Sequence, residues 1–247
     1  LSISTTNIKN KDFSWNTSFI FSHTKTEITN LESQDRAIDL ITNMGGRREG
    51  YPVRSLFSVK FQGLDEDGLP TFLNEKGNVT SDDINFQERE NLDFLQYEGP
   101  TDPTIQGSLG NIFKYKGFAL NVFMTYSFGN VVRLDPVFSA TYSDLSSMTK
   151  EFKNRWVQPG DEKYTDVPVV LSYYQYQNNK QLRYGYNAYN YSDVRIAKGD
   201  FIRMKEISLS YDFPKAWIHP LNNLSLKLQA TNLFLIYADK KLNGQDP

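Results

Sequence analysis

Long stretches of this sequence alternate between apolar and polar residues, and this pattern constrains the fold more than any other feature. In FALNVFMTYSFG (118–129), Phe118, Leu120 and Val122 fall on one side, whereas Asn121 and Thr125 fall on the other. Period two indicates a β-strand, because successive side chains point to opposite faces of a sheet. We therefore predict about six antiparallel strands, at 1–7, 13–22, 108–116, 118–129, 201–214 and 224–232.

The predicted strands are long, and the connections between them alternate in length. Strands of globular proteins average about five or six residues, whereas a tilted strand that crosses a bilayer needs about 9 to 11. NKD, a turn at Gly117 and PKAWIHPLNN join strands in pairs, while the connections at about 23–104 and 130–200 are long. Outer-membrane barrels combine tight periplasmic turns with long extracellular loops. The pattern predicts an all-β fold, a transmembrane antiparallel β-barrel with two long extracellular loops.

Each predicted strand has one apolar stripe, and aromatic residues gather near the strand ends, as in interfacial girdles. Strict alternation through 201–214 places Arg203 and Lys205 on the apolar side near the rim, where long basic side chains can reach the headgroups. The alternative is a soluble β-sandwich with the same stripe buried in its core. We predict that the polar stripe faces a watery lumen and that the following residues face lipid: Phe13, Trp15, Phe19, Phe118, Leu120, Val122, Met124, Leu209, Tyr211 and Leu226.

Composition excludes several function classes. The chain has no cysteine, which excludes disulfides, thiolate metal sites and a cysteine nucleophile. It has 27 Lys and Arg against 29 Asp and Glu, and this balance gives no reason to expect a nucleic-acid partner. The sequence also has no run of about 18 to 20 apolar residues, the length that a transmembrane helix requires.

No motif gives positive support for catalysis or metal binding. GLDEDGLPTF begins like a calcium loop, but Leu69 and Thr71 stand where oxygen ligands should continue, so a turn built from Asp and Gly is the simpler interpretation. Acidic pairs that are close in sequence say nothing about carboxylate spacing across a cleft. We predict no metal, no cofactor and no enzyme activity, and a glycoside hydrolase fragment remains only a third hypothesis.

The segment NNKQLRYGYNAYNYSD (178–193) is rich in Tyr and Asn. Rings can stack on a ligand while amides form hydrogen bonds with it, so this mixture suits carbohydrate or peptide contacts, although it is also normal on an exposed loop. A soluble all-β carbohydrate-binding module with this segment as its binding loop is therefore the alternative function.

Five segments, taken in order, resemble a known family. They are residues 48–79, 97–130, RWVQPGDEKYTDVP (155–168), GDFIRMKEISLSYDFP (199–214) and LSLKLQATNLFLIYADKKLNGQDP (224–247). In this order they resemble the C-terminal part of SusC/RagA-type TonB-dependent outer-membrane transporters of Bacteroidota.

The resemblance implies a barrel of about 22 strands with a plugged lumen, a SusD-like surface lipoprotein as its lid, and uptake of oligosaccharides or oligopeptides driven through TonB. Plug and N-terminal domains are not recognisable in this sequence. We therefore expect residues 1–247 to be a C-terminal segment of such a barrel, surrounded by outer-membrane lipid. The candidates for ligand or lid contacts are Arg155, Trp156, Tyr173, Tyr174, Tyr176, Tyr184, Tyr186, Tyr189 and Tyr191.

Overall fold

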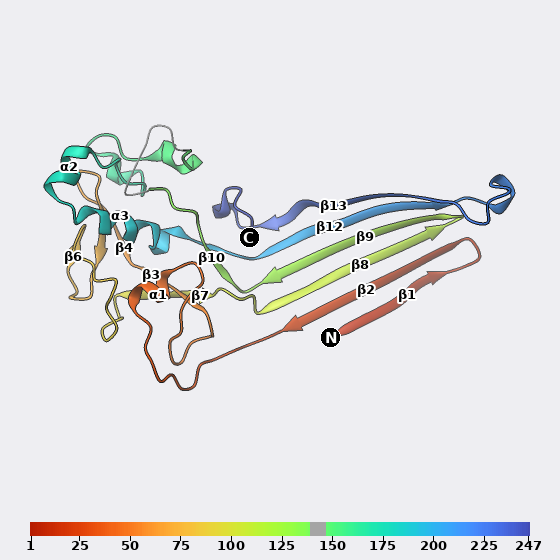
Figure 1. Cartoon of the computed structure of the whole chain (residues 1–247), viewed down its shortest axis with the longest axis horizontal. Coiled ribbons are helices and arrows are strands. Elements are labelled where there is room, and N and C mark those ends of the chain that lie inside the picture. The colour runs from red at the N-terminus through yellow and green to blue at the C-terminus, as the bar shows by residue number, and fades with distance from the viewer. Residues whose placement is uncertain (139–146) are drawn as a thin grey trace.

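A computed structural model describes residues 1–138 and 147–247, which form one long sheet and a folded unit at one end of it (Figure 1). The sheet has six strands of 8 to 14 residues, and every neighbouring pair is antiparallel. In spatial order the strands are β1 (Ser2–Lys9), β2 (Phe13–His23), β8 (Ile105–Tyr115), β9 (Phe118–Phe128), β12 (Phe201–Asp212) and β13 (Ser225–Ala238).

Short connections lie at one end of the sheet and long connections at the other (Figure 1). Lys116 and Gly117 both have positive φ, 44° and 89°, which is the backbone of a two-residue type I′ hairpin turn between β8 and β9. Residues 24–104 and 129–200 make the long connections and build the folded unit. The predicted loop at 130–200 includes residues 139–146, which lie outside the described residues.

The register aligns side chains into rows that cross the sheet, because directly paired residues of antiparallel strands share a face. One row at the tight-turn end consists of Phe13, Tyr115, Phe118, Tyr211 and Leu226. The ring centroids of Phe118 and Tyr211 are 4.4 Å apart. All ten residues that we predicted to face lipid lie on the same face as this row, which we call the apolar face.

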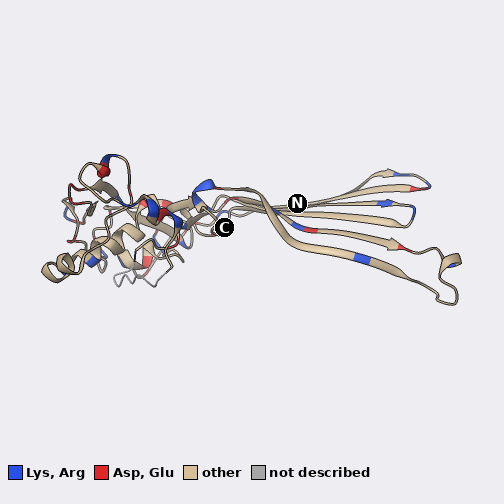
Figure 2. Cartoon of the chain, turned by 90° about the horizontal axis from the view of Figure 1, so that it is seen from above, with Lys and Arg blue, Asp and Glu red and all other residues tan. Residues whose placement is uncertain are grey.

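The charged residues of the sheet identify the opposite face, which we call the polar face. Figure 2 shows that charges crowd the folded unit and are sparse along the strands. Among the Lys, Arg, Asp and Glu residues of the six strands, all but Lys205 lie on the polar face, although Ile20, Ile112 and Phe123 also lie there. The charged residues on this face are Lys9, Lys114, Arg203, Glu206, Asp212 and Lys227.

The placement of Arg203 corrects the prediction from strict alternation. The pairing of β12 with β9 shifts between Met204 and Glu206, so Lys205 is an extra residue in β12. One extra residue shifts the alternation, so side chains before the bulge lie on the opposite face from the one that strict alternation would give them. Arg203 consequently pairs with Thr125 on the polar face, whereas Met204 pairs with Met124 on the apolar face.

The apolar face is not covered within the described part of the chain. Phe118 is 48% exposed and Leu226 is 58% exposed. A β-sandwich would have sealed both side chains between two sheets, so the sandwich alternative does not describe this fold. Among the described residues, no helix has the length and apolar character to span a membrane.

The folded unit has its own hydrophobic core, which includes Phe57, Phe72, Tyr186 and Tyr189. Short strands and helices surround this core and connect back to the long sheet. They are α1 (Ala37–Ile41), β3 (Ser55–Val59), β4 (Phe61–Leu64), β5 (Pro70–Leu73), β6 (Val79–Thr80), β7 (Leu95–Pro100), β10 (Val131–Arg133), α2 (Tyr173–Asn178), α3 (Leu182–Asn190) and β11 (Ile196–Lys198).

Candidate functional site: a polar row and a charged cavity

A row of mainly polar side chains crosses the entire sheet on the polar face. The Asn121 amide donates to Glu206 Oε1 at 3.1 Å, and the Thr6 hydroxyl donates to Asn16 Oδ1 at 2.9 Å. Such groups can exchange hydrogen bonds with water or with a polar solute, so this face suits a solvated passage. From β1 to β13 the row consists of Thr6, Asn16, Ile112, Asn121, Ser208 and Gln229.

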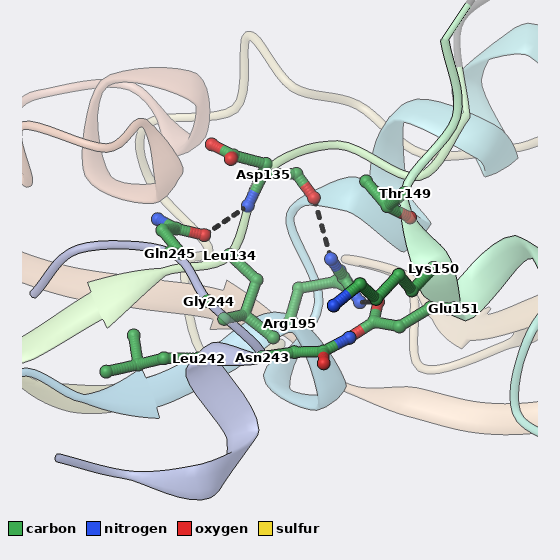
Figure 3. A pocket seen from close by; sticks show the side chains of 10 residues that line it. All are labelled: Leu134, Asp135, Thr149, Lys150, Glu151, Arg195, Leu242, Asn243, Gly244 and Gln245. Atoms are coloured by element: carbon green, nitrogen blue, oxygen red, sulfur yellow. Dashed lines mark hydrogen bonds and ion pairs between the residues drawn. The ribbon is translucent and has the colours of Figure 1, made fainter.

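A cavity of about 250 Å³ lies where the folded unit meets the segment that follows β13 (Figure 3). Both charge signs are present in its lining, which includes Asp135, Glu151, Lys150 and Arg195. The segment after β13 completes the wall through Leu242, Asn243, Gly244 and Gln245. The cavity is therefore assembled from parts of the chain that are distant in sequence.

Arg195 is the buried cation of this cavity, with 4% of its surface exposed. Its Nη1 forms an ion pair with Glu151, and its Nη2 donates to the Asp135 carbonyl at 2.6 Å (Figure 3). The Nε of Arg195 and the hydroxyl of Thr149 are buried without a hydrogen-bond partner among the described residues. Among the described residues, Glu151 is the acidic side chain that pairs with Arg195.

The segment after β13 is fixed to the folded unit by its side chains. Gln245 Oε1 accepts from the Asp135 amide at 2.8 Å, and Gln245 Nε2 donates to the Arg133 carbonyl at 2.9 Å. Leu242 packs with Leu134 and Ala197 in a small second cluster. These contacts couple the segment to β10 and β11.

Arg133 is a second buried cation, near the junction of the sheet and the folded unit. Its guanidinium donates to the carbonyls of Phe57 at 2.8 Å and Ser192 at 3.1 Å. Burial lowers the pKa of Arg133 to about 10, and the charge of Glu98 opposes this shift. Burial also raises the pKa of Glu98, whose carboxyl group accepts a hydrogen bond from the Ser58 hydroxyl. This network joins β3, β7 and β10.

The structure separates the predicted contact residues into two groups. Tyr186 and Tyr189 are 4% and 2% exposed, and burial raises the pKa of each phenol. The Tyr186 hydroxyl donates to the Val169 carbonyl at 2.7 Å. These two side chains belong to the core of the folded unit, where they are not accessible to a ligand.

Trp156 is also buried, and its indole Nε1 donates to Glu162 Oε2 at 3.1 Å. Its ring lies directly over Gly68, so the turn of GLDEDGLPTF and the RWVQPGD segment meet in the folded unit. The Asp65 carboxylate caps that turn, because Oδ1 accepts from the amides of Asp67 and Leu69 at 3.0 and 2.8 Å.

The accessible candidates lie on the outside of the folded unit. Tyr173 and Tyr174 in α2 are 79% and 75% exposed, while Tyr176, Tyr184 and Tyr191 are half-buried. Arg155 is half-buried beside an open cavity of about 520 Å³, which Tyr164 also lines. The nine candidates therefore do not converge on one site.

Sequence reasoning did not identify Arg133, Arg195 or Gln245. Arg133 and Arg195 lie in the long connection 129–200 and Gln245 lies in the segment after β13, and no motif around any of them marks it as buried. Their positions follow from contacts with residues far away in the chain, so no local signal was present to find them.

Comparison with known proteins supports the architecture, although no protein-family model matches the chain. Two TonB-dependent receptors of Formosa agariphila align with it. Receptor P39 is 27% identical over 287 residues, covering 95% of this chain and 26% of the receptor. Receptor P3 is 25% identical over 263 residues, covering 100% of this chain and 24% of the receptor. The chain thus spans about a quarter of the length of these relatives.

Solved structures of the RagAB peptide transporter share the fold. The alignment with one of them has a TM-score of 0.67 at 21% identity, and it covers 100% of this chain and 26% of the transporter chain. The alignment with the RagAB peptide importer in its closed-closed state has a TM-score of 0.63 at 21% identity, and it covers 98% of this chain and 26% of the importer chain. The resemblance to RagA-type TonB-dependent receptors is confirmed. The fold is that of a segment of a transmembrane β-barrel, and the predicted outer-membrane location is confirmed as well.

Replacement of Glu151 by glutamine should loosen the folded unit. Arg195 would keep its carbonyl acceptor but lose its charge partner while remaining buried. Removing one partner of a buried ion pair costs about 3–5 kcal/mol, and the glutamine oxygen, which can still accept from Arg195, keeps the expected loss near the lower end of that range. We expect limited proteolysis of the purified full-length protein to cleave the folded unit faster in this variant.

Asp93→Asn is the matched control, because Asp93 forms an ion pair with Arg48 at 3.5 Å while its side chain is 90% exposed. An exposed pair contributes between about 0 and 1 kcal/mol, so the control should be cleaved at the unmodified rate. Equal rates for both variants and the unmodified receptor would show that Arg195 does not need Glu151.

Proposed function

We propose that this chain forms part of the wall of a TonB-dependent outer-membrane importer. In this proposal the apolar face contacts lipid, and the polar face lines the passage. The observation that carries it is the placement of charge: every Lys, Arg, Asp and Glu of the six strands except Lys205 is on the polar face. A charge facing hydrocarbon is costly, whereas a charge facing a wet lumen is not.

The proposed cargo is an oligopeptide or an oligosaccharide. The solved relatives are named as a peptide transporter, which favours peptide. The folded unit would stand on the extracellular side, where a SusD-like lipoprotein would cover it and where Arg155, Tyr173 and Tyr174 could contact the lid or the cargo. Energy would reach the barrel through TonB, by way of other parts of the receptor. The proposal assigns no catalytic step to this chain.

Lysine substitutions at neighbouring positions test the orientation of the sheet. Val122→Lys places a charge on the apolar face, near the middle of β9, where an ammonium in lipid costs about 2–4 kcal/mol. We expect this variant to reduce the amount of folded receptor in outer membranes, measured by its migration on gels with and without heating.

Asn121→Lys is the matched control, because it introduces the same side chain one residue away on the polar face. It should assemble like the unmodified receptor. If Asn121→Lys impaired assembly and Val122→Lys did not, the orientation proposed for the sheet would be reversed.

Import is tested in cells that lack the receptor. Fluorescent oligopeptides and fluorescent oligosaccharides are offered separately, and at least one of these classes should enter cells that carry the full-length receptor and functional TonB and fail to enter when either is removed. Uptake that continues without the receptor, or without TonB, contradicts the proposed function.

A further inference from the structure

The connection between β12 and β13, residues 213–224, differs from the other connections at the tight-turn end. It contains a short 3₁₀ helix, Lys215–Trp217, and projects beyond the end of the sheet (Figure 1). Trp217 is 71% exposed and Leu221 is 58% exposed. The other two connections, residues 10–12 and 116–117, contain only Asn, Lys, Asp and Gly. At the tight-turn end, large apolar side chains are therefore exposed in the β12–β13 connection and are absent from the other two connections.

Backbone hydrogen bonds hold this connection in a defined shape. The Trp217 amide donates to the Pro214 carbonyl at 2.9 Å, and the Leu221 amide donates to the Ile218 carbonyl at 2.7 Å. Ile218, between these turns, is only 7% exposed. The exposure of Trp217 and Leu221 thus belongs to a folded connection rather than to a frayed one.

The apolar face of the sheet continues into this connection. The Phe213 amide donates to the Leu224 carbonyl at 3.0 Å, which extends the β12–β13 ladder. Phe213 and Leu224 are two residues beyond the paired Tyr211 and Leu226, so they lie on the same face. The rings of Tyr211 and Phe213 are in contact, with centroids 4.9 Å apart.

The charge of the connection complements an anionic surface. Lys215 is its only residue among Lys, Arg, Asp and Glu. Tryptophan is enriched at membrane–water interfaces, long basic side chains reach headgroups from such positions, and anionic lipids attract basic residues near the surface. This connection combines exposed Trp and Leu side chains with one Lys, and it lies next to the apolar face. That combination is typical of an interfacial anchor.

We propose that residues 213–224 are an interfacial anchor, in which Trp217 and Leu221 insert among the phospholipid headgroups at the tight-turn end of the barrel. This inference rests on the proposed function, because it needs the apolar face to contact lipid. The occupant is the phospholipid leaflet itself. Another protein segment covering the same side chains is the competing outcome that the experiment must separate.

Spin labels at single cysteines test the anchor in the full-length receptor, reconstituted in vesicles of phosphatidylethanolamine and phosphatidylglycerol. Trp217→Cys and Leu221→Cys are each labelled with a nitroxide, after replacement of any cysteine elsewhere in the receptor. Collisions with oxygen, which concentrates in lipid, are compared with collisions with a water-soluble nickel chelate. We expect oxygen to dominate at both positions, with a shift towards the chelate when the vesicles are replaced by a non-ionic detergent of short chain length.

Two control positions make the result interpretable. Lys11→Cys, in the polar β1–β2 turn, should respond mainly to the chelate, and Leu209→Cys, on the apolar face, should respond mainly to oxygen. Chelate dominance at residues 217 and 221 would overturn the anchor, as would low accessibility to both reagents, which indicates cover by protein. If Leu209→Cys also responded to the chelate, the proposed function would fail together with the anchor. Each labelled variant must first show the heat-dependent migration of a folded barrel.

Discussion

Replacement of Gly107 by valine should prevent most of the receptor from assembling in the outer membrane. Gly107 of β8 lies opposite Tyr126 of β9 on the apolar face. The Tyr126 ring crosses the β8 backbone at this glycine, and its hydroxyl donates to the Ile20 carbonyl of β2 at 2.8 Å. The Phe19 and Tyr126 rings also stack, with centroids 6.2 Å apart. This arrangement ties three strands together over a position that has no side chain.

A Cβ at Gly107 would collide with both the Ile20 carbonyl oxygen and the Tyr126 hydroxyl. The first of these is backbone within a strand pair, so it cannot move without breaking the ladder. Overpacking of this kind typically costs 1–3 kcal/mol and sometimes more, and the tyrosine hydrogen bond contributes about 1 kcal/mol. We expect a total loss of about 4 kcal/mol, measured as a smaller folded fraction on unheated gels and a lower urea midpoint.

Gly110→Ala is the control for Gly107→Val, because it adds a side chain to the same strand on the polar face. The nearest atom to its Cβ is the Ser18 hydroxyl at 2.7 Å. That hydroxyl is the end of a side chain that can rotate away, so assembly should change little. Assembly of Gly107→Val at the unmodified level would show that the tyrosine crossing does not constrain the sheet.

Replacement of Gly185 by valine should unfold the folded unit while leaving the barrel intact. Gly185 lies in α3 and is buried against the backbone of Ser81, and a Cβ there would collide with the Ser81 carbonyl oxygen. The helix cannot move away freely, because Tyr186 and Tyr189 fix it to the core. We expect a loss of about 4 kcal/mol from the stability of this unit, which is more than the roughly 1–3 kcal/mol typical of overpacking and among the largest effects of single substitutions.

Proteolysis of intact cells measures this effect, because the proposed function places the folded unit on the extracellular side. Gly185→Val should be cut rapidly between residues 24 and 200, yet its barrel should still migrate as folded on unheated gels. Asn187→Val is the matched control, because it introduces the same residue on the exposed side of the same helix. Slow cleavage of both variants would mean that α3 tolerates bulk at residue 185.

The proposed barrel wall accounts for the uncovered apolar face of the sheet. Leu226 and Leu228 in β13 are 58% and 65% exposed. In the proposed barrel these side chains face lipid, so their contact with hydrocarbon stabilises the protein in the membrane. The same logic extends to Trp217 and Leu221, whose exposure is explained by a membrane surface.

The sequence by itself determined the strands, their antiparallel order and the apolar stripe. Alternation and turn residues are local properties, so Phe118, Leu120 and Val122 could be assigned to one face, and Gly117 to a turn, without knowledge of any partner. The last strand was predicted to end near residue 232, yet β13 continues to Ala238. Asn232 has a φ of 50° there and interrupts the simple alternation.

Only the tertiary structure decided which side chains change face at a bulge and which side chains the folded unit buries. The extra residue at Lys205 is defined by the register with β9, so Arg203 could not be assigned to the polar face from β12 alone. Likewise, Tyr186 and Tyr189 share the composition of exposed tyrosines in the same segment, but contacts with distant residues bury them. Arg195 became a buried cation because Glu151 and the Asp135 carbonyl meet it in space. Period and composition are carried by neighbours in the chain, whereas register and burial depend on which distant segments pack together.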